Sequence, residues 1–151
     1  MTILFTKQGF EDTKAKLEKE IARRPETVKT LTRAREMGDL SENGLYRAAK
    51  FELSDIDREI RHLKKLIFYG KVITPQNNDY VQVGHKVVIE NENGKKEFLI
   101  VGEYEANPKQ NKLSNKSPFG FALMGKKAGD NVIIKTPSST LNFKLLSISS
   151  D

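Results

Sequence analysis

Residues 46–67 read YRAAKFELSDIDREIRHLKKLI, and this stretch decides the fold of the first half of the chain. Its apolar side chains recur at alternating spacings of three and four residues, which is the heptad pattern of a coiled coil. They are Tyr46, Ala49, Leu53, Ile56, Ile60, Leu63 and Ile67. Charged side chains fill most positions between them, so the pattern predicts a helix with one apolar stripe that packs against a partner helix.

A second helix with the same period is predicted upstream. Its apolar stripe consists of Phe10, Leu17, Ile21, Val28 and Leu31, and its polar members are Lys14 and Arg24. Pro25 removes one helical hydrogen bond and is expected to bend this helix without ending it. The segment Glu36–Ser41 is too short for anything except a tight reversal, so the two helices should form an antiparallel hairpin. Arms of about 30 residues rising 1.5 Å per residue would be roughly 45 Å long.

The second half of the chain has the pattern of a small sheet. Glycine, proline and short runs of Val and Ile are concentrated there. The expected strands are Lys86–Glu90, Glu97–Val101, Asn131–Thr136 and Leu141–Ile148, and SPFGFALMGKKAGD at 117–130 predicts one short helix. We therefore expect an α+β protein with a helical hairpin at 1–74 and a mostly antiparallel sheet domain at 75–151.

Composition narrows the chemistry that the protein can perform. The 151 residues include no cysteine and two histidines, which excludes disulfides, a thiolate nucleophile, cysteine-bound zinc and a histidine-rich metal site. No stretch approaches the roughly 18 apolar residues that span a bilayer, so we expect a cytoplasmic protein with no membrane partner. The formal net charge of +6 is spread over both halves of the chain, which is weaker evidence for a nucleic-acid site than one basic cluster.

Two carboxylates, Asp39 and Glu42, stand at the turn of the predicted hairpin. In one interpretation they form a capping box, because an Asp followed three residues later by a Glu can satisfy free backbone N–H groups at a helix start. In the other they are exposed oxygen ligands for Mg²⁺, which usually takes one or two protein carboxylates beside water and phosphate. Spacing alone favours the capping box, and a magnesium site here needs a partner that already holds the metal.

Three segments of the chain together resemble one family. They are RRPETVKTLTRAREMGDLSENGLYRAAK at 23–50, VGEYEAN at 101–107 and LSNKSPFGFALMGKKAGD at 113–130. Their order and spacing are similar to those of the Gre family of bacterial transcript-cleavage factors, GreA and GreB, and nearer to GreA. The resemblance covers the chain from Phe5 to Ile148, and its most specific pieces are GDLSEN at 38–43 and the segment Ser117–Asp130.

The resemblance implies a fold and a function. It implies an N-terminal antiparallel coiled coil and a C-terminal FKBP-like domain that docks on bacterial RNA polymerase near its secondary channel. The coiled coil enters that channel in backtracked complexes, where the positions matching Asp39 and Glu42 help hold the second catalytic Mg²⁺ and orient the attacking water. The polymerase then cleaves its own transcript, so the chain is expected to be no enzyme, to have no cofactor of its own and to act as a monomer.

The resemblance also suggests roles for other residues. The residues expected to shape the tip are Gly38, Asn43 and Tyr46. Those expected to contact the 3′ end of the nascent RNA or the channel wall are Arg33, Arg35, Arg47 and Lys50. Those expected to dock on the polymerase are Ser117, Pro118, Gly120 and Phe121. For Tyr46 a place in the first layer of the helical seam is an equal alternative, and for the basic residues a solvated helix face with paired charges is one.

Two other functions remain open at this point. A regulator that enters the secondary channel would alter transcription by occupancy, without extra cleavage. A prolyl isomerase would use the FKBP-like half, but that half contains no tryptophan and no recognisable proline pocket. The pair Asp39 and Glu42 favours the cleavage factor.

Overall fold

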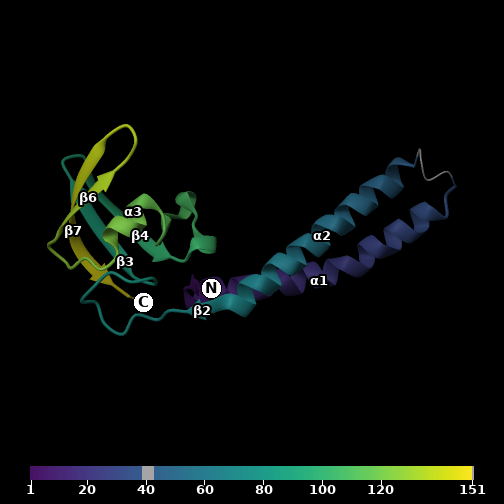
Figure 1. Cartoon of the computed structure of the whole chain (residues 1–151), viewed down its shortest axis with the longest axis horizontal. Helices are drawn as coiled ribbons and strands as arrows, with labels where there is room; N and C mark the ends of the chain where they lie inside the picture. Colours follow the sequence, from purple (N-terminus) through teal and green to yellow (C-terminus); the bar gives the residue numbers. More distant parts are fainter. Residues whose placement is uncertain (39–42, 151) are drawn as a thin grey trace. The chain divides into compact units, whose positions relative to one another are not determined.

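The computed structural model describes residues 1–38 and 43–150 (Figure 1). The chain forms two compact units. One is Glu11–Tyr69, and the other combines Met1–Phe10 with Gly70–Asp151. The first ten residues thus fold with the C-terminal half, while the boundary expected between residues 74 and 75 stays a prediction.

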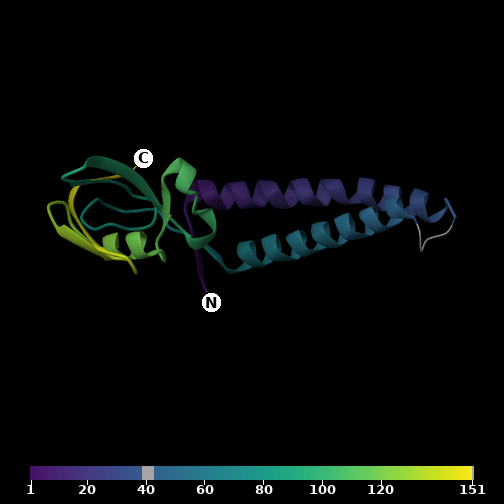
Figure 2. The same cartoon turned by 90° about the horizontal axis from the view of Figure 1, so that it is seen from above.

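The helical unit is the expected hairpin. Helix α1 spans Lys7–Arg35 and continues through Pro25, and helix α2 spans Gly44–Tyr69. The two helices lie side by side and run in opposite directions in both views (Figures 1 and 2). Among the described residues, no helix is long and apolar enough to cross a membrane.

The seam of α2 follows the predicted stripe. Ala49, Ile56 and Leu63 are buried, and the other predicted members are half-buried. Leu66, which the prediction left out, is buried as well. The stripe could be predicted because the buried apolar side chains of this helix recur on one face.

The stripe predicted for α1 is confirmed except at Ile21. Four of its apolar members are half-buried, namely Phe10, Leu17, Val28 and Leu31, whereas Ile21 is 48% exposed. Arg24, a predicted polar member, donates to Asp57 on α2 at 2.7 Å. The buried residues of α1 are Thr13, Thr27 and Ala34, which the prediction left out.

The C-terminal unit contains a five-stranded sheet with the order β5-β4-β3-β7-β6. Its strands are β3 (Lys86–Asn91), β4 (Gly94–Val101), β5 (Lys112–Ser114), β6 (Asn131–Lys135) and β7 (Thr140–Ser149). All neighbours in this sheet are antiparallel except β4 and β5, which are parallel, so the expected mostly antiparallel sheet is confirmed. The short helix α3, Pro118–Leu123, confirms the predicted helix, and the core between it and the sheet includes Val87, Ile100, Leu123 and Leu145.

A second, two-stranded sheet was not predicted. Its strands β1 (Ile3–Phe5) and β2 (Gly70–Val72) pair in parallel, which brings the chain start beside the residues that follow α2. Two short 3₁₀ helices, η1 (Glu103–Glu105) and η2 (Pro108–Gln110), complete the unit.

The start of α1 is held by a carboxylate from η1. The Thr6 hydroxyl accepts from the Gly9 N–H at 3.0 Å, and the Thr6 N–H donates to Glu105 Oε2 at 2.9 Å. A Cβ on Gly9 would lie 1.7 Å from Glu105 Oε1, so only glycine allows this approach. The carboxylate lies where the positive end of a helix dipole stabilises negative charge.

Candidate functional site

Asn43 joins the facing ends of the two helices. Its Oδ1 accepts from the Tyr46 N–H at 3.0 Å, which makes Asn43 the N-cap of α2. Its Nδ2 donates to the Ala34 carbonyl at 2.6 Å, in the last turn of α1. One side chain thus satisfies a free donor of one helix and an acceptor of the other. The tip-shaping role of Asn43 stays a prediction, and these hydrogen bonds supply a mechanism for it.

Asp39 and Glu42 lie outside the described residues. Helix α2 begins at Gly44 with Asn43 as its N-cap. The capping-box and the magnesium-ligand interpretations of Asp39 and Glu42 both stay predictions.

Gly38 has the backbone conformation that a tight reversal needs. Its φ is +114°, a value that residues with a Cβ rarely adopt. A Cβ at this position would meet no atom of the described residues within 4 Å, so the requirement seen there is conformational. The sequence pointed to Gly38 through the resemblance, and the positive φ gives the physical reason for glycine.

Two predicted basic residues lie beside the ring of Tyr46, which is itself a predicted site residue. The Arg35 guanidinium carbon lies 6.0 Å from the centre of the Tyr46 ring, and Lys50 Nζ lies 5.7 Å from it. Both distances suit a cation–π interaction. Tyr46 is half-buried, so its ring both contributes to the seam and holds two cations near the tip.

Some cations of the hairpin have carboxylate partners and others do not. Further from the tip, three arginines are paired: Arg23 with Glu52 at 3.1 Å, Arg24 with Asp57 at 2.7 Å and Arg58 with Asp55 at 2.9 Å. The hydrogen bond from Arg24 holds the pKa of Asp57 below its ordinary value. Near the tip, no carboxylate of residues 1–38 or 43–150 lies within salt-bridge distance of Arg33, Arg35, Arg47 or Lys50.

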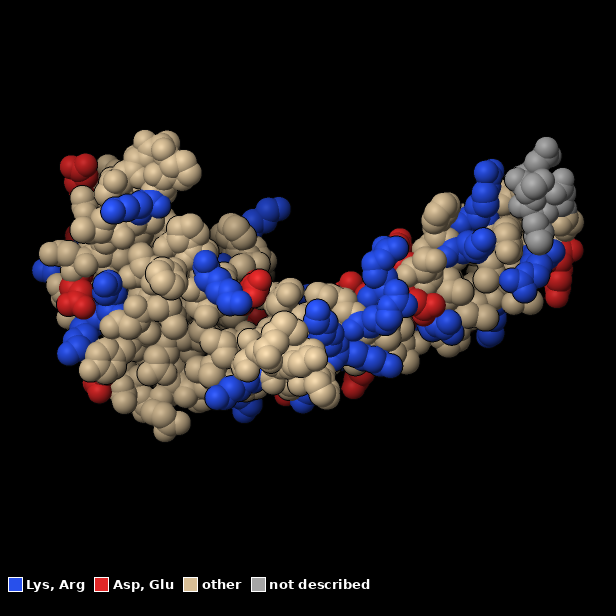
Figure 3. Space-filling view, in the orientation of Figure 1, with Lys and Arg blue, Asp and Glu red and all other residues tan. Residues whose placement is uncertain are grey.

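An alternative for the four basic residues near the tip is an ordinary solvated helix face with paired charges. Lys and Arg side chains gather along the visible face of the hairpin (Figure 3). The pairing typical of such a face is present at Arg23, Arg24 and Arg58. Within the described part of the chain it is missing at the four residues predicted to contact RNA, and also at Lys64 and Lys65 far from the tip. A contact with RNA phosphates requires available cations, so the four tip residues meet that requirement without being unique in it.

The four predicted docking residues divide into two kinds. Ser117 caps α3, since its hydroxyl accepts from the Gly120 N–H at 3.1 Å, and Gly120 is buried. A Cβ on Gly120 would lie 1.9 Å from the Ser114 carbonyl oxygen, so glycine is required there. Pro118 is exposed and the Phe121 side chain is 74% exposed. Ser117 and Gly120 therefore hold the local structure, and Pro118 and Phe121 are available to a partner.

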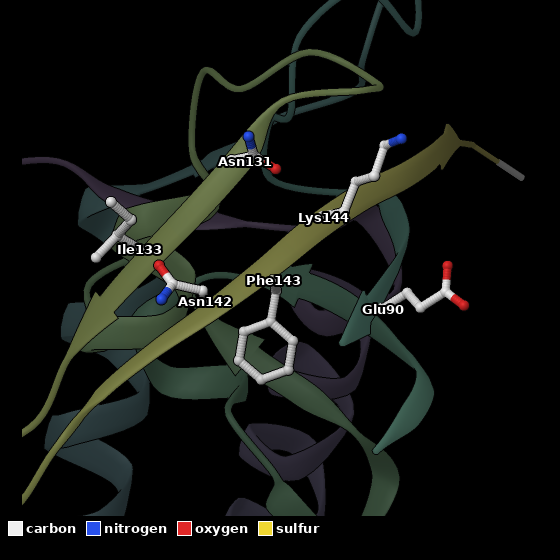
Figure 4. A pocket seen from close by; sticks show the side chains of 6 residues that line it. All are labelled: Glu90, Asn131, Ile133, Asn142, Phe143 and Lys144. Carbon is white, nitrogen blue, oxygen red and sulfur yellow. The ribbon is translucent and has the colours of Figure 1, made fainter. Parts of the chain in front are cut away.

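The rest of the C-terminal unit offers little for catalysis. An open hollow of about 420 Å³ lies over β3, β6 and β7, and its lining side chains spread along the sheet without converging on one point (Figure 4). They are Glu90, Asn131, Ile133, Asn142, Phe143 and Lys144. Among the residues that the structure describes, no three His, Asp or Glu side chains gather as a metal site.

His85 is a buried structural residue. Its side chain is fully buried, its Nδ1 accepts from the Gln82 N–H at 2.9 Å, and its Nε2 lies 2.9 Å from the Asn77 carbonyl oxygen. Both ring nitrogens are thus used within the fold.

Two features of the hairpin were not predicted from the sequence. One is the capping role of Asn43, which the preference of asparagine for N-cap positions could have indicated. The other is the exposed aromatic side chain of Phe51 on α2.

Comparison with known proteins shows the family to which the chain belongs. The N-terminal model of the transcription elongation factors matches residues 3–72, and the C-terminal GreA/GreB model of these factors matches residues 76–150. Transcription elongation factor GreA of Thermodesulfovibrio yellowstonii is 41% identical over 152 residues, covering 97% of this chain and 96% of the relative. GreA of Roseiflexus sp. strain RS-1 is 34% identical, covering 95% and 94%.

A solved structure with similar sequence is GreA factor homolog 1 (Gfh1) of Thermus thermophilus. It is 27% identical, the match covers 99% of this chain and 100% of that one, and the TM-score is 0.47. The two family models together account for almost every residue of the chain. On these matches and the identities above 30% over nearly full length, this chain belongs to the GreA/GreB family of transcription elongation factors.

Proposed function

We propose that this protein binds bacterial RNA polymerase, inserts its helical hairpin into the secondary channel and stimulates the cleavage of backtracked RNA by the polymerase. The observation that carries the proposal is the family membership over both halves of the chain. The hairpin supports it, because its tip joins a glycine reversal at Gly38, a capped helix start at Asn43 and nearby cations without described partners.

Asp39 and Glu42 are the residues proposed to act on the reaction. Magnesium prefers oxygen ligands, and a polymerase that holds one ion loosely gains from a partner that adds carboxylates. In hydrolysis at a two-metal centre, one ion activates the water and the other stabilises the leaving oxygen. A gain of about 1.4 kcal/mol in transition-state stabilisation raises the rate tenfold, so two added contacts suffice for a large stimulation.

The basic residues near the tip are proposed to guide the RNA. Arg33, Arg35, Arg47 and Lys50 present positive charge to phosphates, and such contacts do not depend on sequence. Pro118 and Phe121 are proposed as the exposed part of the docking surface on the C-terminal unit. In this proposal the protein itself cleaves nothing, and it works in the cytoplasm, where the polymerase is found.

RNA cleavage in halted, backtracked elongation complexes tests the proposal. We expect the parent protein to accelerate cleavage, and we expect Asp39→Asn and Glu42→Gln each to reduce the acceleration about tenfold or more at limiting Mg²⁺. Glu36→Gln is the matched control, because it removes an exposed carboxylate from the end of α1 and should behave as the parent does.

A binding measurement separates stimulation from occupancy. Both tip variants should compete for polymerase as well as the parent, since the altered carboxylates serve the metal and not the docking. If the parent bound the polymerase and changed transcription without any added cleavage, the proposal would be wrong and a channel-blocking regulator would replace it. If both variants stimulated cleavage fully, the metal role of Asp39 and Glu42 would be wrong.

A further inference from the structure

Phe51 is an exposed aromatic ring on α2 that the fold does not use. Its side chain is 72% exposed, although transfer of an aromatic ring out of water is favourable and most such rings are at least partly covered. It lies seven residues after the start of α2, which is about 10 Å along the helix from the tip. Phe51 is therefore an exposed ring close to the proposed RNA path.

The surroundings of Phe51 are basic and open. Arg47, Lys50, Phe51 and Ser54 line a hollow of about 260 Å³. They follow one another at helical spacings and so share one face of α2, distinct from the seam that contains Ala49 and Ile56. Ser54, one turn on from Lys50, is small, which leaves room beside the ring.

The cations of this hollow are available to a ligand. No carboxylate among residues 1–38 and 43–150 forms an ion pair with Arg47 or Lys50, while Glu52 on the same helix is engaged by Arg23. Lys50 also lies over the Tyr46 ring, so it connects the hollow with the aromatic ring nearest the tip. Positive charge beside an exposed ring is the combination with which proteins bind single-stranded nucleic acid, the cations contacting phosphates and the ring stacking on a base.

We propose that Phe51, with Arg47 and Lys50 beside it, is a stacking platform for an unpaired base of single-stranded RNA. The inference rests on the proposed function, in which extruded RNA passes the hairpin, and it adds a base contact to the phosphate contacts already assigned. A protein partner fits the hollow less well, because lysine is depleted in protein interfaces and the ring here has cations and a serine as neighbours. Stacking tolerates every base, so the contact would raise affinity without imposing a sequence.

The test uses backtracked elongation complexes whose extruded RNA carries 2-aminopurine, a base whose fluorescence falls when it stacks. We expect the parent protein to quench this fluorescence. Phe51→Leu keeps an apolar side chain but loses the flat ring, so it should quench less and should require about fivefold or more protein for half-maximal cleavage. Because position 51 is exposed, we expect the variant to fold, and circular dichroism checks this.

Phe68→Leu is the matched control. Phe68 is 79% exposed on the same helix, about 25 Å further along it. It should match the parent in quenching and in cleavage. If Phe51→Leu also matched the parent while the parent stimulated cleavage normally, the stacking platform would be refuted and the proposed function would stand.

Two further outcomes separate the remaining explanations. If Phe51→Leu lost affinity for polymerase that carries no RNA, Phe51 would contact protein and the inference would be overturned. If the parent itself failed to stimulate cleavage, the proposed function would fail first, and the platform would lose the RNA that it is proposed to bind.

Discussion

Replacement of Asn43 by alanine should loosen the hairpin where its two helices meet. The side chain accepts from the Tyr46 N–H at 3.0 Å and donates to the Ala34 carbonyl at 2.6 Å. Loss of an N-cap asparagine costs about 0.5–2 kcal/mol. Loss of the second hydrogen bond costs about 0.5–1.5 kcal/mol. Asn43→Ala should therefore lower the free energy of unfolding by about 1–3.5 kcal/mol.

Asn43→Asp separates the two hydrogen bonds. An aspartate keeps an oxygen that can accept from the Tyr46 N–H, but it offers no donor to the Ala34 carbonyl. This variant should lose only the contribution of the second bond, about 1 kcal/mol. Asn142→Ala is the control: Asn142 is exposed on β7, and its truncation should change stability by about 0.5 kcal/mol or less.

Urea unfolding followed by circular dichroism at the helix band measures both effects. The signal reports the hairpin, because α1 and α2 contain 29 and 26 residues whereas α3 contains 6. A loss of 2 kcal/mol should lower the urea midpoint by roughly 1 M. An unchanged midpoint for Asn43→Ala would refute the claim that this side chain holds the helix ends together. Equal losses for the alanine and aspartate variants would show that the cap of α2 contributes nothing measurable.

Two further predictions concern other parts of the chain. Because Arg24 lowers the pKa of Asp57, the pair stabilises the fold above the unfolded pKa of about 4 and the benefit is lost as pH falls through the lower folded pKa. Asp57→Asn should thus lower the urea midpoint at pH 7, and the difference from the parent should shrink as the pH falls below about 4; a difference that stayed constant through this acid range would contradict this origin. Gly120→Ala should lower the thermal midpoint, since its Cβ would lie 1.9 Å from the Ser114 carbonyl oxygen and such overpacking costs about 1–3 kcal/mol. Gly44→Ala is its counterpart, because a Cβ there meets no atom within 4 Å and should raise stability by about 0.4–1 kcal/mol.

The two helices show where reading the sequence succeeds and where it fails. In α2 the buried apolar side chains lie on one face, and their spacing located the buried Ala49, Ile56 and Leu63. In α1 the buried residues are Thr13, Thr27 and Ala34. None of them is a large apolar side chain, so the apolar spacing along α1 did not mark them, and the predicted Ile21 is exposed.

The strands show a similar contrast. Strands β3, β4, β6 and β7 could be predicted because each carries apolar residues in a local pattern and has at least one antiparallel neighbour. Strands β1, β2 and β5 have three residues each and pair in parallel with distant segments, so no local signal marks them. At the tip, composition indicated carboxylates and cations, but the roles of Asn43 and Phe51 depend on hydrogen bonds and exposure that only coordinates show.

Exposed ion pairs contribute little to the stability of the hairpin. Such pairs typically contribute about 0–1 kcal/mol, so the protein loses little stability by leaving Arg33, Arg35, Arg47 and Lys50 without carboxylates from the described chain. In the proposed function the same cations would gain more by contacting RNA phosphates, because every phosphate neutralised releases counterions. Arg24 and Asp57, by contrast, link the two helices further from the tip. If the tip cations bind RNA as proposed, RNA-dependent association should weaken steeply with salt while the stability of the hairpin should not.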